Sequence, residues 1–180
     1  MKYPVTLAVN GREHRVEVEA RTLLVDLLRD ELGLGGVRIG CETGSCNACT
    51  VLLDGKAVKS CNVLALQVDG RRVTTIEGLG RVAGVGTAEG SRRLPQESEP
   101  LHAIQRAFLE QGATACGFCA AGALLAAKDI LDRPLDPALV EVSLALRGHV
   151  CRCTGYGGLL EAVQSVPRAA GGGPSSRTET

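Results

Sequence analysis

The sequence predicts an α+β protein in which a small domain of strands is followed by a domain of helices. Apolar residues alternate on both sides of an Asn-Gly pair at 10–11, and after residue 101 they recur at helical spacing. A stretch rich in Gly, Ser and Pro separates the two patterns. We therefore predict a first domain at 1–79, a linker at 80–100, a helical domain at 101–168 and a disordered tail at 169–180.

The composition is typical of a soluble globular protein, with 44% hydrophobic and 22% charged residues. Twenty basic residues balance twenty acidic ones, and aromatic residues make up only 2%, so nothing favours binding of nucleic acid. The first residues alternate like a strand, unlike a signal peptide, and no apolar run is long enough to span a bilayer. We expect a cytoplasmic protein without membrane insertion.

The first domain is predicted to begin with a β-hairpin. Asn10-Gly11 is typical of a type I′ turn, because both central residues of that turn need positive φ. The flanking strands are indicated by alternating apolar residues: Val5, Leu7, Val9, Val16 and Val18.

A helix is expected next, with Thr22 as its cap and Gly33 as its end. Its apolar face would consist of Leu24, Leu27, Leu28 and Leu32. Further along, Asp54-Gly55 predicts a second hairpin turn between strands at 50–53 and 56–60. A closing strand at 72–76 would complete the domain.

Between the helix and the second hairpin lies a cysteine loop, residues 40–50, which reads G-C-E-T-G-S-C-N-A-C-T. Cys41, Cys46 and Cys49 have the spacing C-x4-C-x2-C, and Cys61 is the next cysteine, which is the plant-type ligand spacing for a [2Fe–2S] cluster. Small residues in the loop would let the backbone wrap the cluster closely. Zinc and disulfides are the alternatives, but zinc usually takes two separate C-x2-C pairs and disulfides belong to oxidising compartments.

The second domain is predicted to contain four short helices around a shared core. Asp136-Pro137 is a typical start for the third of them. The apolar stripes are Leu101, Ile104, Ala107 and Phe108; Leu124, Leu125, Ile130 and Leu131; Leu139, Val142 and Leu146; and Leu159, Leu160, Val163 and Val166.

Four further cysteines lie between these helices. Cys116-x2-Cys119 falls between the first two and Cys151-x-Cys153 between the last two, so an up-and-down bundle would place both pairs at one end. This geometry suits a second cluster, with a zinc site or a redox C-x-x-C pair as alternatives. The first cluster favours a second one, because two clusters in sequence conduct electrons and a zinc site does not.

The chain resembles the two-cluster iron–sulfur subunit of molybdenum hydroxylases, the xanthine dehydrogenase, aldehyde oxidoreductase and carbon monoxide dehydrogenase family. The matching stretches are the cysteine loop with its continuation T-V-L-L-D-G-K-A-V-K-S-C, then T-T-I-E-G-L, C-G-F-C and C-R-C-T-G-Y. The resemblance covers residues 3–79 and 101–166. It implies a β-grasp, plant ferredoxin-like domain followed by a four-helix bundle, each with its own [2Fe–2S] cluster.

The resemblance also implies how the chain works. The helical-domain cluster would lie beside molybdopterin in a large catalytic subunit, with Gly117 and Cys153 near the pterin, and the other cluster would pass electrons to FAD in a medium subunit or to another acceptor. This chain would then have no catalytic residue of its own. A stand-alone ferredoxin-like carrier or redox sensor is the alternative, and a zinc-stabilised interaction module is a third class.

Several positions depart from the family pattern. Ala115 replaces a Gln that contacts the pterin, Asn47 replaces a Gly, and His149 replaces an Asn before the last cysteine pair; Ala120-Ala121-Gly122 replaces Thr-Pro-Gly, and the linker is longer. We expect His149 to have a structural role or to contact a ligand residue, because all eight cysteines are present and no His ligand is needed. Arg152 would either reduce the negative charge of a cluster or lie in solvent.

Overall fold

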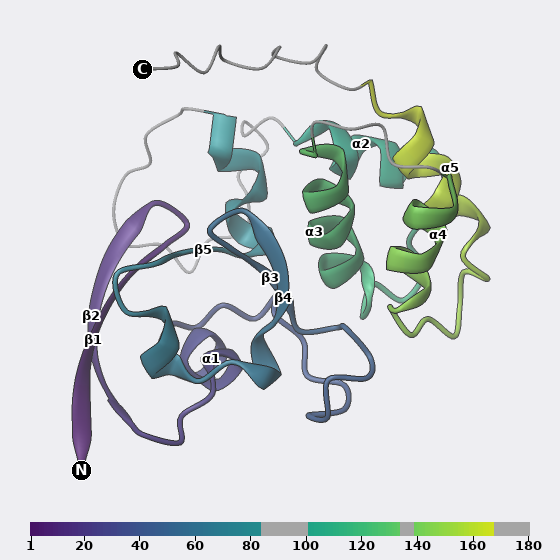
Figure 1. Ribbon diagram of the computed structural model, residues 1–180. Helices are drawn as coiled ribbons and strands as arrows, with labels where there is room; N and C mark the ends of the chain where they lie inside the picture. The colour runs from purple at the N-terminus through teal and green to yellow at the C-terminus, as the bar shows by residue number, and fades with distance from the viewer. Residues whose placement is uncertain (84–100, 134–138, 168–180) are drawn as a thin grey trace, which may run out of the picture.

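The computed structural model describes residues 1–83, 101–133 and 139–167 (Figure 1). Most of the predicted linker, the helix start predicted at Asp136-Pro137 and the predicted tail lie outside these residues. The described part combines a five-stranded sheet with four longer helices, which agrees with the predicted α+β class.

One mixed sheet forms the first domain, with strand order β2-β1-β5-β3-β4. Its strands are β1 Lys2–Val9, β2 Arg12–Glu19, β3 Thr50–Leu53, β4 Lys56–Lys59 and β5 Arg72–Thr74. Neighbouring strands are antiparallel except β1 and β5, which are parallel. Both predicted hairpins form, and all four central residues of the two turns have positive φ: Asn10 +51°, Gly11 +81°, Asp54 +49° and Gly55 +82°.

The predicted helix begins at Leu24, one residue later than capping by Thr22 predicts. A short α1, Leu24–Asp26, runs into the π-helix η1, Leu27–Glu31, and the residue at the N-cap is Leu23 without a side-chain cap. Capping by Thr22 is therefore wrong, because Val63 supplies the carbonyl that accepts from the first helical amide, Leu24 N–H, at 2.8 Å. Gly33 ends the helix as predicted, with φ +70°.

Two strands end earlier than predicted. The strand expected at 56–60 stops at Lys59, and Ser60–Asn62 forms a 3-10 turn, η2. Both the amide and the hydroxyl of Ser60 donate to the Cys49 carbonyl, at 3.3 and 2.7 Å, and these bonds turn the chain toward the cysteine loop. The strand expected at 72–76 stops at Thr74, and the 3-10 helix η4, Ile76–Ala83, follows and continues past the predicted boundary at 79.

Four helices follow the sheet domain: α2 Ala103–Glu110, α3 Ala120–Leu131, α4 Leu139–Arg147 and α5 Gly157–Ser165. They share one buried core that includes Ile104, Phe108, Leu125, Leu146 and Leu159. The first predicted stripe includes Leu101, but this residue precedes α2 and is exposed, and the His102 side chain caps the helix by accepting from Ile104 N–H.

The sheet and the helices are packed against each other. Helix α3 lies along β3 and β4 (Figure 1). Leu52 of β3 and Leu79 of η4 are buried in the same cluster as the helical core residues. The two domains are therefore fixed relative to each other by apolar contacts. Within the described part of the chain, no helix has both the length and the apolar character needed to cross a membrane.

Candidate metal centres

The first four predicted ligands lie together at one end of the sheet domain. Cys49 immediately precedes β3 and Cys61 lies in η2, and both are buried, whereas Cys41 and Cys46 are half-buried in the loop. The four sulfurs interact with one another: Cys46 with Cys41 and Cys49, and Cys61 with Cys49 and Cys41. The closeness of Cys49 and Cys61 follows from the hydrogen bonds of Ser60 to Cys49.

The cysteine loop directs backbone amides at a sulfur. Ser45 N–H and Cys46 N–H each donate to Cys41 Sγ at 3.3 Å. Positive φ at Glu42 (+56°), Gly44 (+75°) and Asn47 (+59°) allows the tight path of the chain. Hydrogen bonds, first of all from the Thr43 backbone, lower the pKa of Cys41 to about 6 and so favour its thiolate.

The pKa values of Cys46 and Cys61 are shifted in the opposite direction. Burial raises the pKa of Cys46, and burial together with a hydrogen bond to Cys49 raises the pKa of Cys61 to about 11. Since metals bind thiolates, metal binding here releases protons.

Gly40 is required for space, because a Cβ at this position would lie 2.9 Å from Cys46 Sγ.

The second four predicted ligands are also brought together, from two different connections. Cys116 and Cys119 lie between α2 and α3, and Cys151 and Cys153 lie between α4 and α5. The sulfur of Cys119 interacts with that of Cys151, and Cys116 with Cys153. Cys119 is buried, Cys151 half-buried, and Cys116 and Cys153 are exposed.

The same contrast of pKa values occurs in this centre. Burial raises the pKa of Cys119 to about 11. Burial also acts to raise the pKa of Cys151, but hydrogen bonds from the side chain and backbone of Thr154 outweigh it, and the pKa is lowered to about 7. Each centre thus contains one sulfur that hydrogen bonds prepare as a thiolate.

Both metal alternatives use four thiolates. A structural zinc ion takes all four around one point, whereas in a [2Fe–2S] cluster each iron takes two of them. The C-x4-C-x2-C spacing of the first centre, followed by Cys61, is the plant-type spacing of a [2Fe–2S] cluster.

The two centres are in direct contact through the backbone. Val150 N–H, immediately before Cys151, donates to the carbonyl of Cys46 at 3.1 Å. Phe118, from the C-G-F-C segment, lies against the first loop, since its Cε1 is 3.3 Å from the position of a Cβ on Gly40. Gly122 of α3 packs against the Asn47 carbonyl so closely that a Cβ there would lie 2.5 Å from that oxygen.

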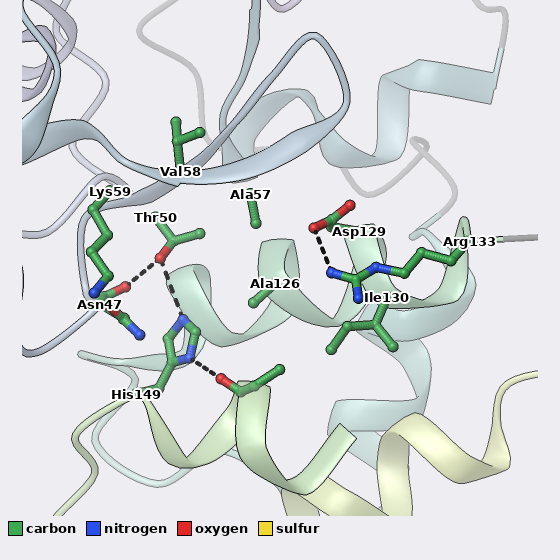
Figure 2. Close-up of a pocket in the computed structure, with 11 residues that line it drawn as sticks. Asn47, Thr50, Ala57, Val58, Lys59, Ala126, Asp129, Ile130, Arg133 and His149 are labelled. Carbon is green, nitrogen blue, oxygen red and sulfur yellow. Dashed lines mark hydrogen bonds and ion pairs between the residues drawn. The ribbon is translucent and has the colours of Figure 1, made fainter. Parts of the chain in front are cut away.

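A pocket of about 190 Å³ lies beside this contact, between the β3–β4 hairpin and helices α3 and α4 (Figure 2). At one end Thr50 Oγ1 donates to the Asn47 carbonyl at 2.7 Å and lies 3.4 Å from His149 Nε2. His149 Nδ1 is 3.3 Å from the Ala145 carbonyl, and burial lowers the pKa of this imidazole. His149 therefore connects Thr50 of β3 with Ala145 of α4 and so joins the two domains.

A buried carboxylate lies at the other end of the pocket. Asp129 of α3 is 6% exposed; Arg133 Nη2 donates to its Oδ2 at 3.3 Å. Its Oδ1 accepts no hydrogen bond from the described residues but lies 3.5 Å from Lys56 Nζ of β4 in an ion pair. This group links the helical domain to the hairpin.

Several residues around the centres could not be found from spacing alone. Val150 acts through its backbone N–H, and Asn47 through its carbonyl, so their side-chain types carry no signal. Thr154 is visible in the sequence as part of C-R-C-T-G-Y, but its contact with Cys151 depends on the local turn. Arg152 is exposed, as is the neighbouring Cys153, and Gly117 has φ +80° in an exposed turn.

Comparison with known proteins defines the class of the protein first. Residues 7–74 match the family described as "2Fe-2S iron-sulfur cluster binding domain", and residues 87–164 match "[2Fe-2S] binding domain". The chain thus contains two [2Fe–2S] cluster-binding domains, which agrees with its two groups of four cysteines.

Longer matches define the family more narrowly. The chain is 42% identical over 167 residues to the nicotine 6-hydroxylase small subunit of Paenarthrobacter nicotinovorans, covering 93% of this chain and 91% of that subunit. The structure of quinoline 2-oxidoreductase from Pseudomonas putida 86 matches with TM-score 0.75, 36% identity and 91% coverage of both chains. Aldehyde oxidoreductase from Desulfovibrio gigas matches with TM-score 0.77 and 40% identity, over 91% of this chain and 17% of that one.

The chain therefore belongs to the family of small iron–sulfur subunits of molybdenum hydroxylases, and the resemblance found in its sequence is confirmed. Its function is electron transfer within an oxidoreductase complex of this type.

Proposed function

We propose that each group of four cysteines holds one cluster, and that electrons pass from a molybdopterin site in a large partner subunit, through the helical-domain cluster and then the sheet-domain cluster, to FAD in a further subunit or to another acceptor. The ligands would be Cys116, Cys119, Cys151 and Cys153 for the former, and Cys41, Cys46, Cys49 and Cys61 for the latter. When bound, the clusters would each supply a one-electron carrier.

The hydrogen bond between Val150 and Cys46 is the observation that carries this proposal. It joins a ligand residue of one centre to the residue adjacent to a ligand of the other, over 3.1 Å. Two centres with independent structural roles would not need such a contact. A carrier with two clusters in sequence does, because electron transfer between them depends on their closeness.

Exposure supports the proposed direction. Cys116 and Cys153 are exposed, and the apolar side chains of Phe118 (46% exposed) and Val150 (62%) lie next to ligand positions of the same centre. Exposed apolar side chains around a redox centre are typical of a surface that a partner covers. We place the large molybdopterin-binding subunit on this face, near Gly117 and Cys153, and the electron acceptor beyond the cysteine loop of the sheet domain.

The finer features of the fold belong to the same proposal. We assign a β-grasp arrangement to the sheet domain and a four-helix bundle to α2–α5, and we take the chain to act in the cytoplasm as part of a heteromeric complex. The mixed five-stranded sheet and the single core shared by the four helices support the two fold assignments.

The relatives indicate that substrate choice lies outside this chain. The identity is 42% to a subunit named for nicotine 6-hydroxylase and 40% to a protein named aldehyde oxidoreductase. This chain is thus almost equally similar to relatives named for substrates as different as an alkaloid and an aldehyde. We therefore place the oxidation of substrate in the large subunit.

The test is iron, zinc and acid-labile sulfide analysis, together with low-temperature EPR of the dithionite-reduced protein, purified anaerobically with its associated chains. The proposal expects four irons per chain, two distinct S = 1/2 signals and co-purification of a molybdenum-containing subunit. Two irons with zinc would limit electron transfer to one domain. A full iron content in a chain that purifies alone would favour the stand-alone carrier, and zinc without iron would overturn the proposal.

A further inference from the structure

The turn after Cys151 contains a hydroxyl group placed against a predicted ligand sulfur. Thr154 Oγ1 lies 3.1 Å from Cys151 Sγ, and the Thr154 N–H donates to the same sulfur at 3.4 Å. One residue therefore offers two hydrogen bonds to one sulfur of the helical-domain centre.

The direction of the hydroxyl bond follows from its other partner. Tyr156 N–H, a backbone donor, points at Thr154 Oγ1 at 3.3 Å, so the oxygen accepts there. The hydroxyl proton is thus left for Cys151 Sγ. A sulfur that binds iron is a thiolate without a proton, so it can only accept.

The same tyrosine holds the other end of the turn. Cys151 N–H donates to Tyr156 Oη at 2.9 Å, and the Tyr156 side chain packs against the core of the helical domain. Tyr156 itself has φ +70°, a backbone conformation that non-glycine residues rarely adopt. A closed network of Cys151, Thr154 and Tyr156 is thus anchored in packed structure, and it fixes the hydroxyl relative to the sulfur.

We propose that Thr154 is a positioning residue that raises the reduction potential of the helical-domain cluster by donating its hydroxyl hydrogen bond to Cys151 Sγ. Reduction adds negative charge to the cluster and its ligand sulfurs, so a donor at a sulfur stabilises the reduced state more than the oxidised state. The bond favours acceptance of an electron from the partner's site. This inference rests on the proposed function, because it needs a cluster at Cys151.

The experiment compares wild type with Thr154→Val and Thr154→Ser in the full chain with its associated subunits. Valine has the shape of threonine and keeps the backbone N–H but lacks the hydroxyl; serine keeps the hydroxyl. The midpoint potential of each S = 1/2 signal is measured by EPR-monitored redox titration, and the sheet-domain signal in the same sample is the internal reference. Electron–nuclear double resonance in H₂O and D₂O detects an exchangeable proton close to the cluster.

The expected result for Thr154→Val is a potential shifted to more negative values for the helical-domain signal alone, and loss of one exchangeable proton coupling. Thr154→Ser should restore the potential and the coupling. An unchanged potential in Thr154→Val, with full iron and both signals present, would overturn the role of Thr154 while leaving the proposed function intact. Absence of iron from the helical domain of wild type would instead overturn the proposed function itself.

Discussion

The two metal centres differ in how much of the fold each one requires. In the sheet domain, three cysteines belong to one loop and the fourth is delivered by the adjacent hairpin, with Cys49 and Cys61 buried at the edge of the sheet core. In the helical domain, the two pairs come from connections that are separated in sequence by α3 and α4. One centre is local and the other exists only when four helices are packed.

This difference affects the stability of each centre and how well each centre can be predicted from the sequence. A local centre tolerates damage elsewhere in the chain, because its ligands are held by short-range hydrogen bonds such as those of Ser60 to Cys49. A centre built from distant segments is lost when the core that holds these segments together unfolds. Mutations in each core should therefore separate the two clusters.

The largest effect is expected from removing a core side chain of the helical domain. Phe108 of α2 is 1% exposed, and Phe108→Ala should destabilise the helical domain by roughly 3–5 kcal/mol. We expect the iron content to fall by half and the helical-domain EPR signal to disappear, while the signal of the sheet-domain cluster persists. Iron analysis and EPR of the reduced protein measure this directly.

The adjacent residue provides a matched control. Leu109 is 62% exposed on the same helix, and Leu109→Ala should leave the iron content and both signals unchanged. Loss of both clusters in Phe108→Ala would show that the sheet-domain centre is not local, and the contrast drawn between the two regions would be wrong.

A smaller effect on both centres is expected where they touch. A Cβ on Gly122 would lie 2.5 Å from the Asn47 carbonyl and 3.3 Å from that of Ala48, so Gly122→Ala has to push α3 away from the cysteine loop. Overpacking of this kind costs about 1–3 kcal/mol. We expect a lower unfolding temperature and a weaker magnetic interaction between the two reduced clusters, seen as reduced splitting or slower relaxation in EPR.

Gly157, the first residue of α5, has no atom within 4 Å of an added Cβ and is the control. Gly157→Ala should be neutral or stabilising by up to about 1 kcal/mol, with the magnetic interaction intact. Equal behaviour of the two alanine variants would mean that the contact at Gly122 does not set the distance between the centres.

The same contrast explains what could be predicted from the sequence. The hairpin turns at Asn10-Gly11 and Asp54-Gly55 and the C-x4-C-x2-C loop of the first centre follow local rules, in which residue type and spacing alone predict the geometry. The N-terminus of α1 could not be predicted, because its amide is satisfied by the carbonyl of Val63, which is distant in sequence. From the local sequence alone, Thr22 is the expected cap. In the folded chain a tertiary hydrogen bond to Val63 takes the place of that cap.

The contact between the centres was also hidden for a physical reason. It is made by the N–H of Val150 and the carbonyls of Cys46 and Asn47, groups that every residue except proline has in common. No side-chain pattern records such bonds. By contrast, the Cys-x-x-Cys and Cys-x-Cys pairs were expected to come together from the order of the helices alone, and the structure has Cys119 beside Cys151 and Cys116 beside Cys153.

A third variant tests whether the domain contact and the clusters are separable. Asp129→Asn keeps the volume of the buried side chain but removes the charge that faces Lys56 and Arg133. Since the Lys56 side chain is 71% exposed and that of Arg133 47% exposed, we expect a loss of only about 1 kcal/mol, measured as a lower unfolding temperature, with all four irons retained. Glu13→Gln, in a surface-exposed pair with Arg15, should change stability by less than about 0.5 kcal/mol. Loss of iron in Asp129→Asn would mean that the helical-domain centre depends on this ion pair.

The last effect concerns pH. Burial lowers the pKa of His149 below its ordinary value of 6.5. Between pH 6.5 and this lowered pKa, the imidazole is therefore protonated in the unfolded chain but neutral in the folded chain. Above pH 6.5 the imidazole is neutral in both states, so its protonation does not reduce the free energy of unfolding. The free energy of unfolding decreases as the pH falls from 6.5 toward the lowered pKa, by at most about 1.4 kcal/mol for each pH unit.

Thermal unfolding at pH 7.5 and 5.5 should therefore show a larger decrease in wild type than in His149→Asn. The other histidine whose pKa burial lowers, His102, is present in both proteins and cancels in the comparison. Equal decreases would show that the hydrogen bonds to Thr50 and Ala145 stabilise the imidazolium enough to cancel the cost of burial. The junction between the two centres would then be insensitive to acid.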